Sequence, residues 1–256
     1  MIGAAHAGGP TMSVLSKGRY TARFAQGPDD ILAAQRLRAL AFRDAPTGLD
    51  ADTYDDQCLH MLVEDDASGA LVCCFRLMPL DNGRAIEQSY SAQHYGLARL
   101  AKFDGAMVEM GRFCVHPDHH DPDILRVAWG AMTRYVDEAG IEMLFGCSSF
   151  KGTSEEAYLD AFSLLKERHL APKRWLPRVK APSVFPFARK LRLRRPDLKA
   201  AMKAMPPLLR TYLMMGGWVS DHAVVDRDLN TLHVFTGLEI RAIPPARKKL
   251  LRAVAG

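Results

Sequence analysis

The chain has 256 residues, of which 48% are hydrophobic and 25% are charged, and its net charge is +5. This composition is that of a folded globular protein and excludes wholesale disorder, and no apolar run approaches the ~18 residues that a membrane-spanning helix needs. The length suits one large domain. Residues 1–17 have no apolar core of the signal-peptide type, so we expect a disordered N-terminus and a cytoplasmic protein.

Five cysteines are present, an odd number, and no CxxC pair occurs. Buried free thiols in a reducing compartment fit this pattern better than disulfides or a zinc site. The stretch 116–123 is rich in His and Asp, but it falls in a turn between a strand and a helix and lacks ligands at helical spacing. We therefore expect no bound metal.

The first half of the chain predicts a strand, a helix and a β-hairpin. Residues 20–25 are typical of a strand, and the apolar residues that follow recur at helical spacing behind two acidic residues. The polar stretch 46–56 predicts a loop. Two short apolar runs, 59–64 and 71–77, flank a turn with Asp, Ser and Gly and predict a hairpin. In the mixed stretch 82–102 we expect a helix in the second half.

The second half of the chain begins with the order of a crossover unit. An apolar strand at 108–116 ends before a proline, an amphipathic helix spans 123–139, a strand spans 142–147, and a helix spans 155–167. The elements predicted after them are an extended, proline-containing stretch at 175–186, a helix at 206–216, strands at 218–225 and 232–240, and a basic helix from 244.

The strand at 108–116 carries a carboxylate and a guanidinium, Glu109 and Arg112, among apolar residues. A charge inside a buried strand costs several kcal/mol to desolvate unless it is paired or has a task. Gly111 lies between them and suggests a β-bulge or a close approach by a ligand. Two interpretations stay open, an ion pair that only fixes the sheet and a functional pair.

Positive charge is concentrated in an expected insertion at about 172–205 and in a tail over 244–256. Such patches attract nucleic acid, anionic lipid headgroups or an acidic protein. No nucleic-acid-binding motif accompanies them, so we expect no nucleic-acid partner. Apolar residues at 185–193 alternate with basic ones, which is typical either of a membrane-surface element or of a loop packed on the core. The cations of the insertion that we expect to form this patch are Lys173, Arg174, Arg178, Lys180, Arg189, Lys190, Arg192, Arg194 and Arg195.

The predicted order of elements resembles that of the GNAT N-acyltransferase fold, an α/β (α+β) fold with a central mixed twisted sheet flanked by helices. Usual members of that fold bind coenzyme A at a Gly-rich turn after the central strand, where backbone N–H groups hold the pyrophosphate. Here that turn, 116–124, has no glycine and is acidic, so a pyrophosphate would be repelled. The resemblance implies one GNAT-like domain over 18–243 without the usual coenzyme A site.

Several stretches resemble the ornithine-lipid family, whose enzymes N-acylate ornithine with a 3-hydroxy fatty acid from acyl carrier protein. They are LRALAFR at 37–43, CFRLMP at 74–79, EMGRFCVHP at 109–117, LFGCSS at 144–149, PPLLRTYL at 206–213 and DRDLNT at 226–231. The chain is also similar to acyl-homoserine-lactone synthases around Arg38, Phe42, Arg76, Glu109 and Arg112. Those usually carry a tryptophan shortly after the Phe42 position, and this chain has none before Trp129.

The resemblance implies direct attack of an amino acid α-amine on the thioester of a 3-hydroxyacyl-acyl carrier protein, with no bound cofactor. The product with ornithine is lyso-ornithine lipid. Glu109 is the expected general base, directly or through a water, with a pKa raised by burial. Arg112 is the second residue that we expect to be catalytic. A backbone N–H from Phe113, Cys114 or Val115 is expected to stabilise the oxyanion.

The residues implied to bind the amino acid come from several elements. Arg76 and Arg112 would hold its carboxylate or support Glu109, and the 226–231 turn would engage a cationic side chain or simply cap itself. Ser148 has no His partner, which favours a hydrogen-bonding role over a nucleophilic one. The full set is Arg38, Phe42, Arg76, Ser148, Asp226, Asp228 and Asn230, and for Arg38 a solvated helix position is the alternative.

Several alternatives stay open at this point. Glutamine could replace ornithine as acceptor, and a homoserine-lactone synthase, a coenzyme-A-dependent acetyltransferase or a non-catalytic, membrane-associated protein of the same fold are further readings. The expected partners are acyl carrier protein and an amino acid. The alternative use of the basic insertion is an anionic membrane surface, which would place the protein peripherally on the inner membrane.

Overall fold

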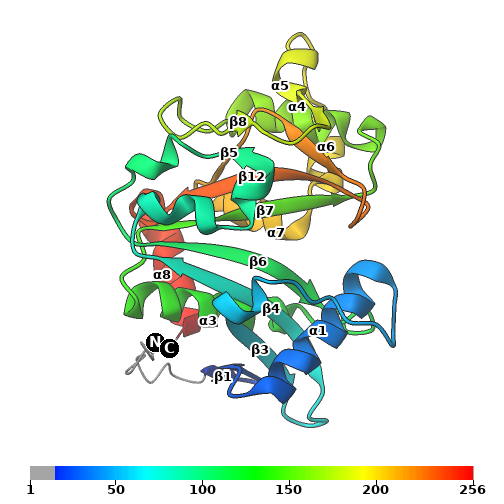
Figure 1. The fold of residues 1–256 in the computed structure, drawn as a ribbon, viewed down its shortest axis with the longest axis vertical. Helices are drawn as coiled ribbons and strands as arrows, with labels where there is room; N and C mark the ends of the chain where they lie inside the picture. The colour runs from blue at the N-terminus through cyan, green and yellow to red at the C-terminus, as the bar shows by residue number, and fades with distance from the viewer. Residues whose placement is uncertain (1–14, 256) are drawn as a thin grey trace, which may run out of the picture.

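Ten strands form one mixed sheet in the computed structural model, which describes residues 15–255 (Figure 1). Neighbouring strands pair antiparallel except for β6 and β7, which pair parallel. In spatial order the strands are β1 (Leu15–Lys17), β2 (Tyr20–Phe24), β3 (Leu59–Asp65), β4 (Leu71–Leu80), β6 (Met107–Val115), β7 (Met143–Lys151), β12 (Thr231–Glu239), β11 (Ala223–Asp226) and β9 (Val184–Phe185), while β10 (Trp218–Val219) also pairs with β12. A second, small sheet joins β5 (Tyr95–Gly96) to β8 (Arg178–Val179).

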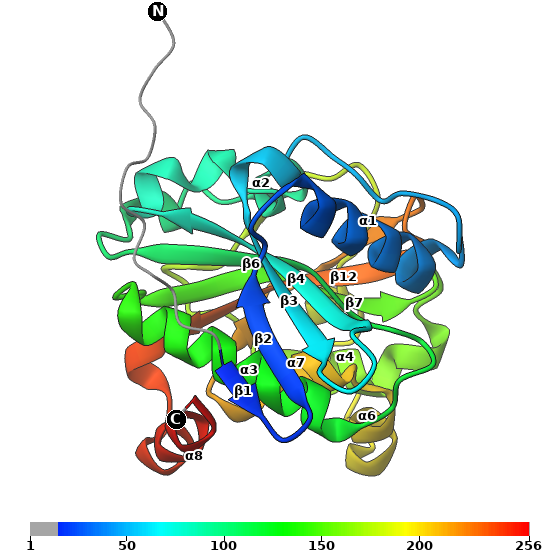
Figure 2. The ribbon, with the colours of Figure 1, turned by 90° about the horizontal axis from the view of Figure 1, so that it is seen from below.

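Helices cover both faces of the large sheet. Figure 2 shows α1 (Pro28–Arg43) and α2 (Ser91–His94) on one face, with α3 (Pro122–Glu138), α4 (Leu159–Arg168), α6 (Leu198–Ala204), α7 (Pro207–Met214) and α8 (Pro245–Ala255) on the other. The remaining α-helix is α5 (Phe187–Lys190), and 3-10 turns span Asp55–Gln57, Gly83–Gln88, Leu100–Lys102, Glu156–Tyr158 and Ile240–Ala242. No helix within residues 15–255 is long and apolar enough to cross a membrane. The expected mixed sheet flanked by helices is confirmed.

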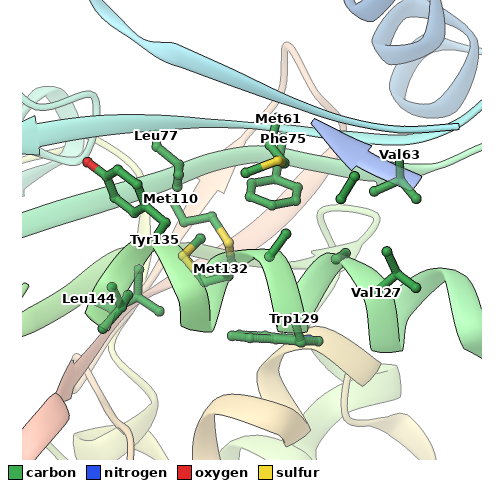
Figure 3. Packing of buried hydrophobic residues seen from close by; sticks show 14 of the residues in the cluster. Met61, Val63, Phe75, Leu77, Met110, Val127, Trp129, Met132, Tyr135 and Leu144 are labelled. Atoms are coloured by element: carbon green, nitrogen blue, oxygen red, sulfur yellow. The ribbon is translucent and has the colours of Figure 1, made fainter. Parts of the chain in front are cut away.

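The largest core cluster lies between the sheet and α3. Side chains of β3, β4 and β6, such as Met61, Phe75 and Met110, face Met132 of the helix, while Trp129 lies on the side of the helix away from the sheet (Figure 3). The helix begins where expected because Pro122 needs no N–H partner in the first turn and the Asp121 side chain accepts a hydrogen bond from the Asp123 N–H at 2.9 Å.

The chain ends differ from expectation. Residues 1–14 of the expected disordered segment lie outside the described residues, while Leu15–Lys17 form β1 and pair with β2, so disorder is wrong for them. Leu15 is buried against α3, where its side chain approaches Gly130. The basic tail is helical as expected, and α8 packs on α3 through the Arg252–Asp137 ion pair at 2.8 Å.

Two stretches differ in their internal structure. A helix was expected in the second half of 82–102, but the chain there forms short turns and the single turn α2, after which Tyr95–Gly96 pairs with β8. The strand expected at 218–225 is split into β10 and β11. At the break, the Ser220 hydroxyl donates to the His222 carbonyl at 2.7 Å and accepts from the Phe235 N–H at 3.1 Å, so a side chain replaces a backbone partner.

The sheet opens between β6 and β7. The two strands pair only from Met107 to Glu109 and then diverge toward their C-terminal ends (Figure 1). Gly146 marks the divergence, because a Cβ there would lie 2.3 Å from the Met110 carbonyl oxygen and its φ is +159°. Beyond this point β7 pairs only with β12, on its other side. The opening is therefore built into the backbone at the centre of the sheet.

A β-bulge lies in β6 just after the divergence. Cys74 pairs with Cys114 and Arg76 with Gly111, so two residues of β6 face one residue of β4. Arg112 takes up the extra length with φ +53°. The bulge therefore begins one residue after Gly111, the position that the sequence suggested, while Gly111 itself lines the pocket, so a close approach by a ligand there stays a prediction.

Candidate active site

A pocket of about 420 Å³ occupies the opening between β6 and β7. Successive side chains of a strand point to opposite faces, so the pocket has two different walls. On the side of α1 and α2 the wall is polar, with Arg76, Tyr90, Glu109, Arg112, Lys151, Asp226, Thr231 and His233. On the side of α3 and α7 it is apolar, with Met110, Phe113, Pro206, Pro207, Leu208 and Leu209.

Glu109 belongs to the polar wall and is buried, and the next residue of β6, Met110, belongs to the apolar wall. The Glu109 Oε1 accepts hydrogen bonds from the N–H and the hydroxyl of Ser91 at 2.7 and 2.5 Å, and its Oε2 accepts one from the Tyr90 N–H at 2.8 Å. Burial raises the pKa of Glu109, and the hydrogen bonds from Ser91 and Tyr90 oppose that rise without cancelling it. The carboxylate is thus held in one orientation, with a pKa shifted toward the range that suits a base.

Glu109 and Arg112 do not form an ion pair with each other. The Arg112 Nε donates to Asp50 at 2.9 Å, its Nη2 donates to Asp52 at 3.2 Å, and its guanidinium lies 5.1 Å from the centre of the Tyr90 ring. Of the two interpretations of the central strand, the one in which Glu109 and Arg112 form an ion pair that only fixes the sheet is therefore wrong. Each charge has its own set of partners.

The loop 46–56 supplies the carboxylates for the arginines around the pocket. Arg76 donates to Asp52 at 2.6 and 2.8 Å and to Asp55 at 2.8 Å. Arg38 donates to Asp55 at 2.8 and 2.6 Å and to the Asp50 carbonyl. Burial opposes ionisation of Asp55, but hydrogen bonds from Arg38 and its neighbours outweigh it and lower the pKa of this carboxyl. The sequence predicted the loop, but it did not predict which arginines its aspartates bind.

Arg38 lies outside the pocket, contrary to its expected contact with substrate. Its side chain is 1% exposed, and its guanidinium donates its hydrogen bonds to the loop that it anchors. Asp228 is also misplaced by the sequence reading, because it is 77% exposed and pairs with Arg43 at 2.9 Å. Both residues act on the site only through the segments that they hold.

The other residues expected to bind substrate do line the pocket, namely Phe42, Arg76, Ser148, Asp226 and Asn230. The Ser148 hydroxyl accepts a hydrogen bond from Thr236 at 2.9 Å and is not paired with a His. The Asp226 Oδ1 caps its turn by accepting from the N–H groups of Asp228 and Leu229, both at 3.0 Å. The sequence left two roles open for Asp226, capping its own turn and contacting the substrate. The structure shows that Asp226 caps the turn and also lines the pocket.

Of the three backbone positions expected to stabilise an oxyanion, Phe113 lines the pocket. Cys114 and Val115 do not line it. The Cys114 thiol is buried 3.5 Å from the Cys74 sulfur, and all five cysteines are free. The buried thiols expected from the sequence are confirmed for Cys73, Cys74 and Cys114, whereas Cys58 and Cys147 are partly exposed.

The turn between β6 and α3 is already occupied by a carboxylate. Asp121 caps the helix N-terminus, and its Oδ2 accepts a hydrogen bond from the Tyr20 hydroxyl at 2.9 Å. An anion at this helix end would meet that carboxylate instead of free N–H groups. Within residues 15–255, no group of three or more His, Cys, Asp or Glu side chains is arranged to hold a metal ion.

The basic insertion is partly core and partly surface. Phe185 and Phe187 are buried, so the expected loop packed on the core holds for them, while Leu193 is 85% exposed. Arg174, Lys180 and Arg194 are bound internally, to Glu239, to the Ala92 carbonyl and to Asp160, and Lys190 lies over the Phe185 ring. The insertion's exposed cations whose side chains make no hydrogen bond, ion pair or ring contact within residues 15–255 are Lys173, Arg178, Arg189, Arg192, Arg195, Lys199 and Lys203.

Several residues of the site were missed by the sequence reading. Ser91 and Tyr90, which hold Glu109, come from a stretch with no recognisable motif. Lys151, Thr231 and His233 line the pocket from the ends of β7 and β12. The only available signal was strand alternation, and it holds for Lys151 and His233, which are polar where their neighbours in sequence are apolar or small, but not for Thr231, which follows the polar Asn230.

Comparison with known proteins agrees with this geometry. The family described as Acetyltransferase (GNAT) domain matches residues 37–130. The L-ornithine N(alpha)-acyltransferase of Rhodobacter capsulatus is 33% identical over 239 residues, which cover 88% of this chain and 91% of that protein. The enzyme of the same name from Brucella abortus is 30% identical over 243 residues, covering 88% of this chain and 86% of that protein.

Among solved structures, FeeM, an N-acyl amino acid synthase from uncultured soil microbes, is similar with a TM-score of 0.50. The match covers 88% of this chain and 94% of FeeM at 11% identity, so the likeness concerns the fold alone. The GNAT fold expected from the order of elements is confirmed. With relatives of this identity along nearly their whole length, the chain belongs to the L-ornithine N(alpha)-acyltransferase family.

Proposed function

We propose that this protein transfers a 3-hydroxy fatty acyl group from acyl carrier protein to the α-amine of ornithine, giving lyso-ornithine lipid, the first step of ornithine lipid synthesis. The observation that carries the proposal is the position of Glu109, a buried carboxylate in the polar wall of a pocket whose other wall is apolar. A polar amino acid and an acyl thioester can approach it from opposite sides. The names of the relatives supply the acceptor.

Glu109 acts as the general base in this reaction. The ornithine α-ammonium gives a proton to Glu109, directly or through a water, and the freed amine attacks the thioester carbon. The C–N bond forms and the C–S bond breaks. The ornithine nitrogen loses two protons in all: Glu109 passes the first to the departing thiolate of the carrier protein, then takes the second from the attacking nitrogen and releases it to solvent. A backbone N–H near Phe113, at the bulge, stabilises the oxyanion that forms between these steps.

The two arginines of the polar wall bind the substrate carboxylate, and aspartates hold them in place for this role. Arg76 and Arg112 are fixed by Asp50, Asp52 and Asp55, so their guanidinium groups cannot swing toward Glu109. A fixed donor array needs no reorganisation when the substrate arrives. Asp50 and its partners therefore position the arginines and do not touch the reacting atoms.

Acyl carrier protein, rather than coenzyme A, is the proposed donor. The carboxylate of Asp121 occupies the helix end at which a pyrophosphate would bind, and a carrier protein presents only a single phosphodiester. The unpaired cations of the insertion, including Arg189, Arg192 and Arg195, suit the acidic surface of such a protein. In that case the KM for the carrier rises with ionic strength.

A peripheral membrane location is the second part of the proposal. Leu193 is 85%, Leu198 47% and Met202 44% exposed, and the chain between and around them carries Arg192 and Arg195. Exposed apolar side chains with cations next to them in sequence suit binding to an anionic bilayer, and the lipid product would enter such a bilayer. Sedimentation with vesicles that contain anionic lipid, but not with neutral vesicles, is the expected result.

The direct test uses the purified full chain with 3-hydroxyacyl-acyl carrier protein and ornithine. Mass spectrometry should detect N-acyl ornithine together with stoichiometric release of the carrier thiol, and Glu109→Gln should lose about 10²- to 10⁴-fold in rate. The same acyl group on coenzyme A should be a poor donor. Equal turnover of the Glu109→Gln variant, or a preference for coenzyme A, would contradict the proposal.

A further inference from the structure

Polar side chains gather on one face of the sheet at the far end of the pocket, away from Glu109. Thr231 of β12 pairs with Lys151 of β7 on one side and with Asp226 of β11 on the other. His233, two residues along β12, points to the same face as Thr231 because side chains alternate along a strand. All four residues line the pocket. The pocket thus ends in a polar patch that the acyl-transfer chemistry itself does not use.

His233 presents a fixed hydrogen-bond acceptor in this patch. The Tyr95 hydroxyl donates to the His233 carbonyl at 2.8 Å, so the Tyr95 oxygen can only accept from the His233 Nδ1, which lies at 3.1 Å. The ring hydrogen is therefore on Nδ1, and Nε2 carries a lone pair. Burial, with His94 and His222 nearby, lowers the pKa of His233 to about 3, so the ring is neutral at pH 7.

The acceptors of the patch have no partners within residues 15–255. The Nε2 of His233 and the hydroxyl of Thr231 are both buried and make no hydrogen bond. The Asp226 carboxylate forms no ion pair with any described residue, and its Oδ2 has no hydrogen-bond donor, because only Oδ1 caps the turn. Asp226 also lies near the His94 imidazole: burial lowers the pKa of His94, and the charge of Asp226 opposes that shift.

Unpaired buried acceptors are costly unless a ligand completes them. A half-buried carboxylate beside two further acceptors matches a primary ammonium, which has three N–H donors and a positive charge. We propose that Asp226, Thr231 and His233 form a subsite that binds the side-chain ammonium of a diamino acid and so selects ornithine over neutral amino acids of the same length. This proposal rests on the proposed acyltransferase function. It adds that the pocket recognises the side-chain ammonium of the amino acid acceptor.

Glutamine is the informative competitor. Its amide nitrogen lies as many bonds from Cα as the side-chain nitrogen of ornithine, and the Thr231 hydroxyl could donate to its amide oxygen. What glutamine cannot supply is a positive charge for Asp226, so the carboxylate would be buried against a neutral group. Norvaline, which lacks the nitrogen, would leave every acceptor of the patch unpaired.

The experiment measures kcat/KM of the full chain for ornithine, glutamine and norvaline with one acyl carrier protein donor. We expect the wild type to prefer ornithine to glutamine by at least about tenfold. Asp226→Asn should reduce that preference by about 10- to 100-fold, since a hydrogen bond to a charged group is lost. The loss should appear as a higher KM for ornithine with a smaller change in kcat, a split that a general structural defect would not produce.

Asp228→Asn is the matched control, because Asp228 is two residues away, exposed and outside the pocket. Thr231→Val is the second test variant, since it removes one acceptor at nearly constant size and disturbs no hydrogen bond of the fold. An ornithine to glutamine ratio that moves equally in Asp226→Asn and Asp228→Asn would overturn the subsite, as would a wild type that uses norvaline as well as ornithine.

Calorimetric binding of ornithine separates the two proposals. Binding that is lost in Asp226→Asn and kept in Asp228→Asn supports the subsite even if no acyl transfer occurs, in which case the proposed function fails alone. Turnover of ornithine with an unchanged preference in Asp226→Asn refutes the subsite and leaves the proposed function intact. The absence of both ornithine binding and turnover in the wild type refutes both.

Discussion

Replacing Asp55 by alanine should destabilise the protein strongly, although Asp55 lies in a loop. Its carboxylate accepts hydrogen bonds from Arg38 and Arg76, and the side chains of all three residues are no more than 5% exposed. Arg38, Arg76 and Arg112 are balanced by Asp50, Asp52 and Asp55. The substitution therefore leaves one buried positive charge without compensation.

Breaking a buried ion pair by removing one partner costs about 3–5 kcal/mol. For a domain of this size each kcal/mol lowers the melting temperature by about 2–4 °C, so Asp55→Ala should melt about 6–20 °C below the wild type. The folded-state pKa of Asp55 is lowered from its ordinary value of 3.8. Its contribution to stability is therefore complete above that pH and is lost as the pH falls toward the lowered pKa.

Thermal unfolding followed by circular dichroism at pH 7 tests this reasoning, with Asp56→Ala as the matched control. Asp56 is the next residue and is exposed, so its replacement should change the free energy of unfolding by less than about 0.5 kcal/mol. The difference between the two variants should shrink in acid, because Asp55 is then protonated in the wild type as well. Equal melting temperatures of Asp55→Ala and Asp56→Ala at pH 7 would refute the account of the loop.

Three further predictions concern the reaction and the central sheet. The pKa of Glu109 is raised, so kcat/KM should fall with decreasing pH at a midpoint above 4.5, the ordinary value for Glu, and a midpoint at or below it would argue against Glu109 as base. Gly146→Ala should lose both stability and activity, because its Cβ would overlap a β6 carbonyl, whereas Gly111→Ala, whose Cβ would meet only ordinary contacts at 3.7 Å, should melt like the wild type. Arg192→Ala combined with Arg195→Ala should raise the KM for acyl carrier protein at low salt and remove most of its salt dependence, and an unchanged KM would move docking elsewhere.

The strand that carries the proposed catalytic residues could be found from the sequence because its charges conflict with their surroundings. Glu109 and Arg112 interrupt an otherwise apolar strand, and such residues are costly unless they are used. The pairing between them could not be resolved at that level. The partners of Arg112 come from a loop some sixty positions earlier, and the donors to Glu109 come from the backbone of a short turn, so neither leaves a local pattern.

The loop at 46–56 shows the limit of composition most clearly. Its aspartates are typical of a solvated turn, yet Asp50 and Asp55 are buried. Arg38 is misleading for the same reason, since a helical arginine is usually exposed and this one is fully buried. Charge pairs across long sequence distances are a property of the fold, and only the placement of α1 against β4 and β6 brings these groups together.

The bulge illustrates a smaller error with a physical cause. Gly111 was the natural position for an irregular backbone because glycine accepts positive φ at no cost. The structure instead places positive φ at Arg112, whose guanidinium is held by two carboxylates and an aromatic ring. Side-chain contacts of that strength offset a backbone conformation that the residue alone would avoid.

The most direct test of the central claim is lipid mass spectrometry of a bacterium that lacks aminolipids and expresses this chain. The account predicts a new lyso-ornithine lipid in cells that carry the wild type and its absence in cells that carry a folded Glu109→Gln variant. No N-acyl amino acid in the wild-type cells, or the same amount of lyso-ornithine lipid with Glu109→Gln, would contradict it.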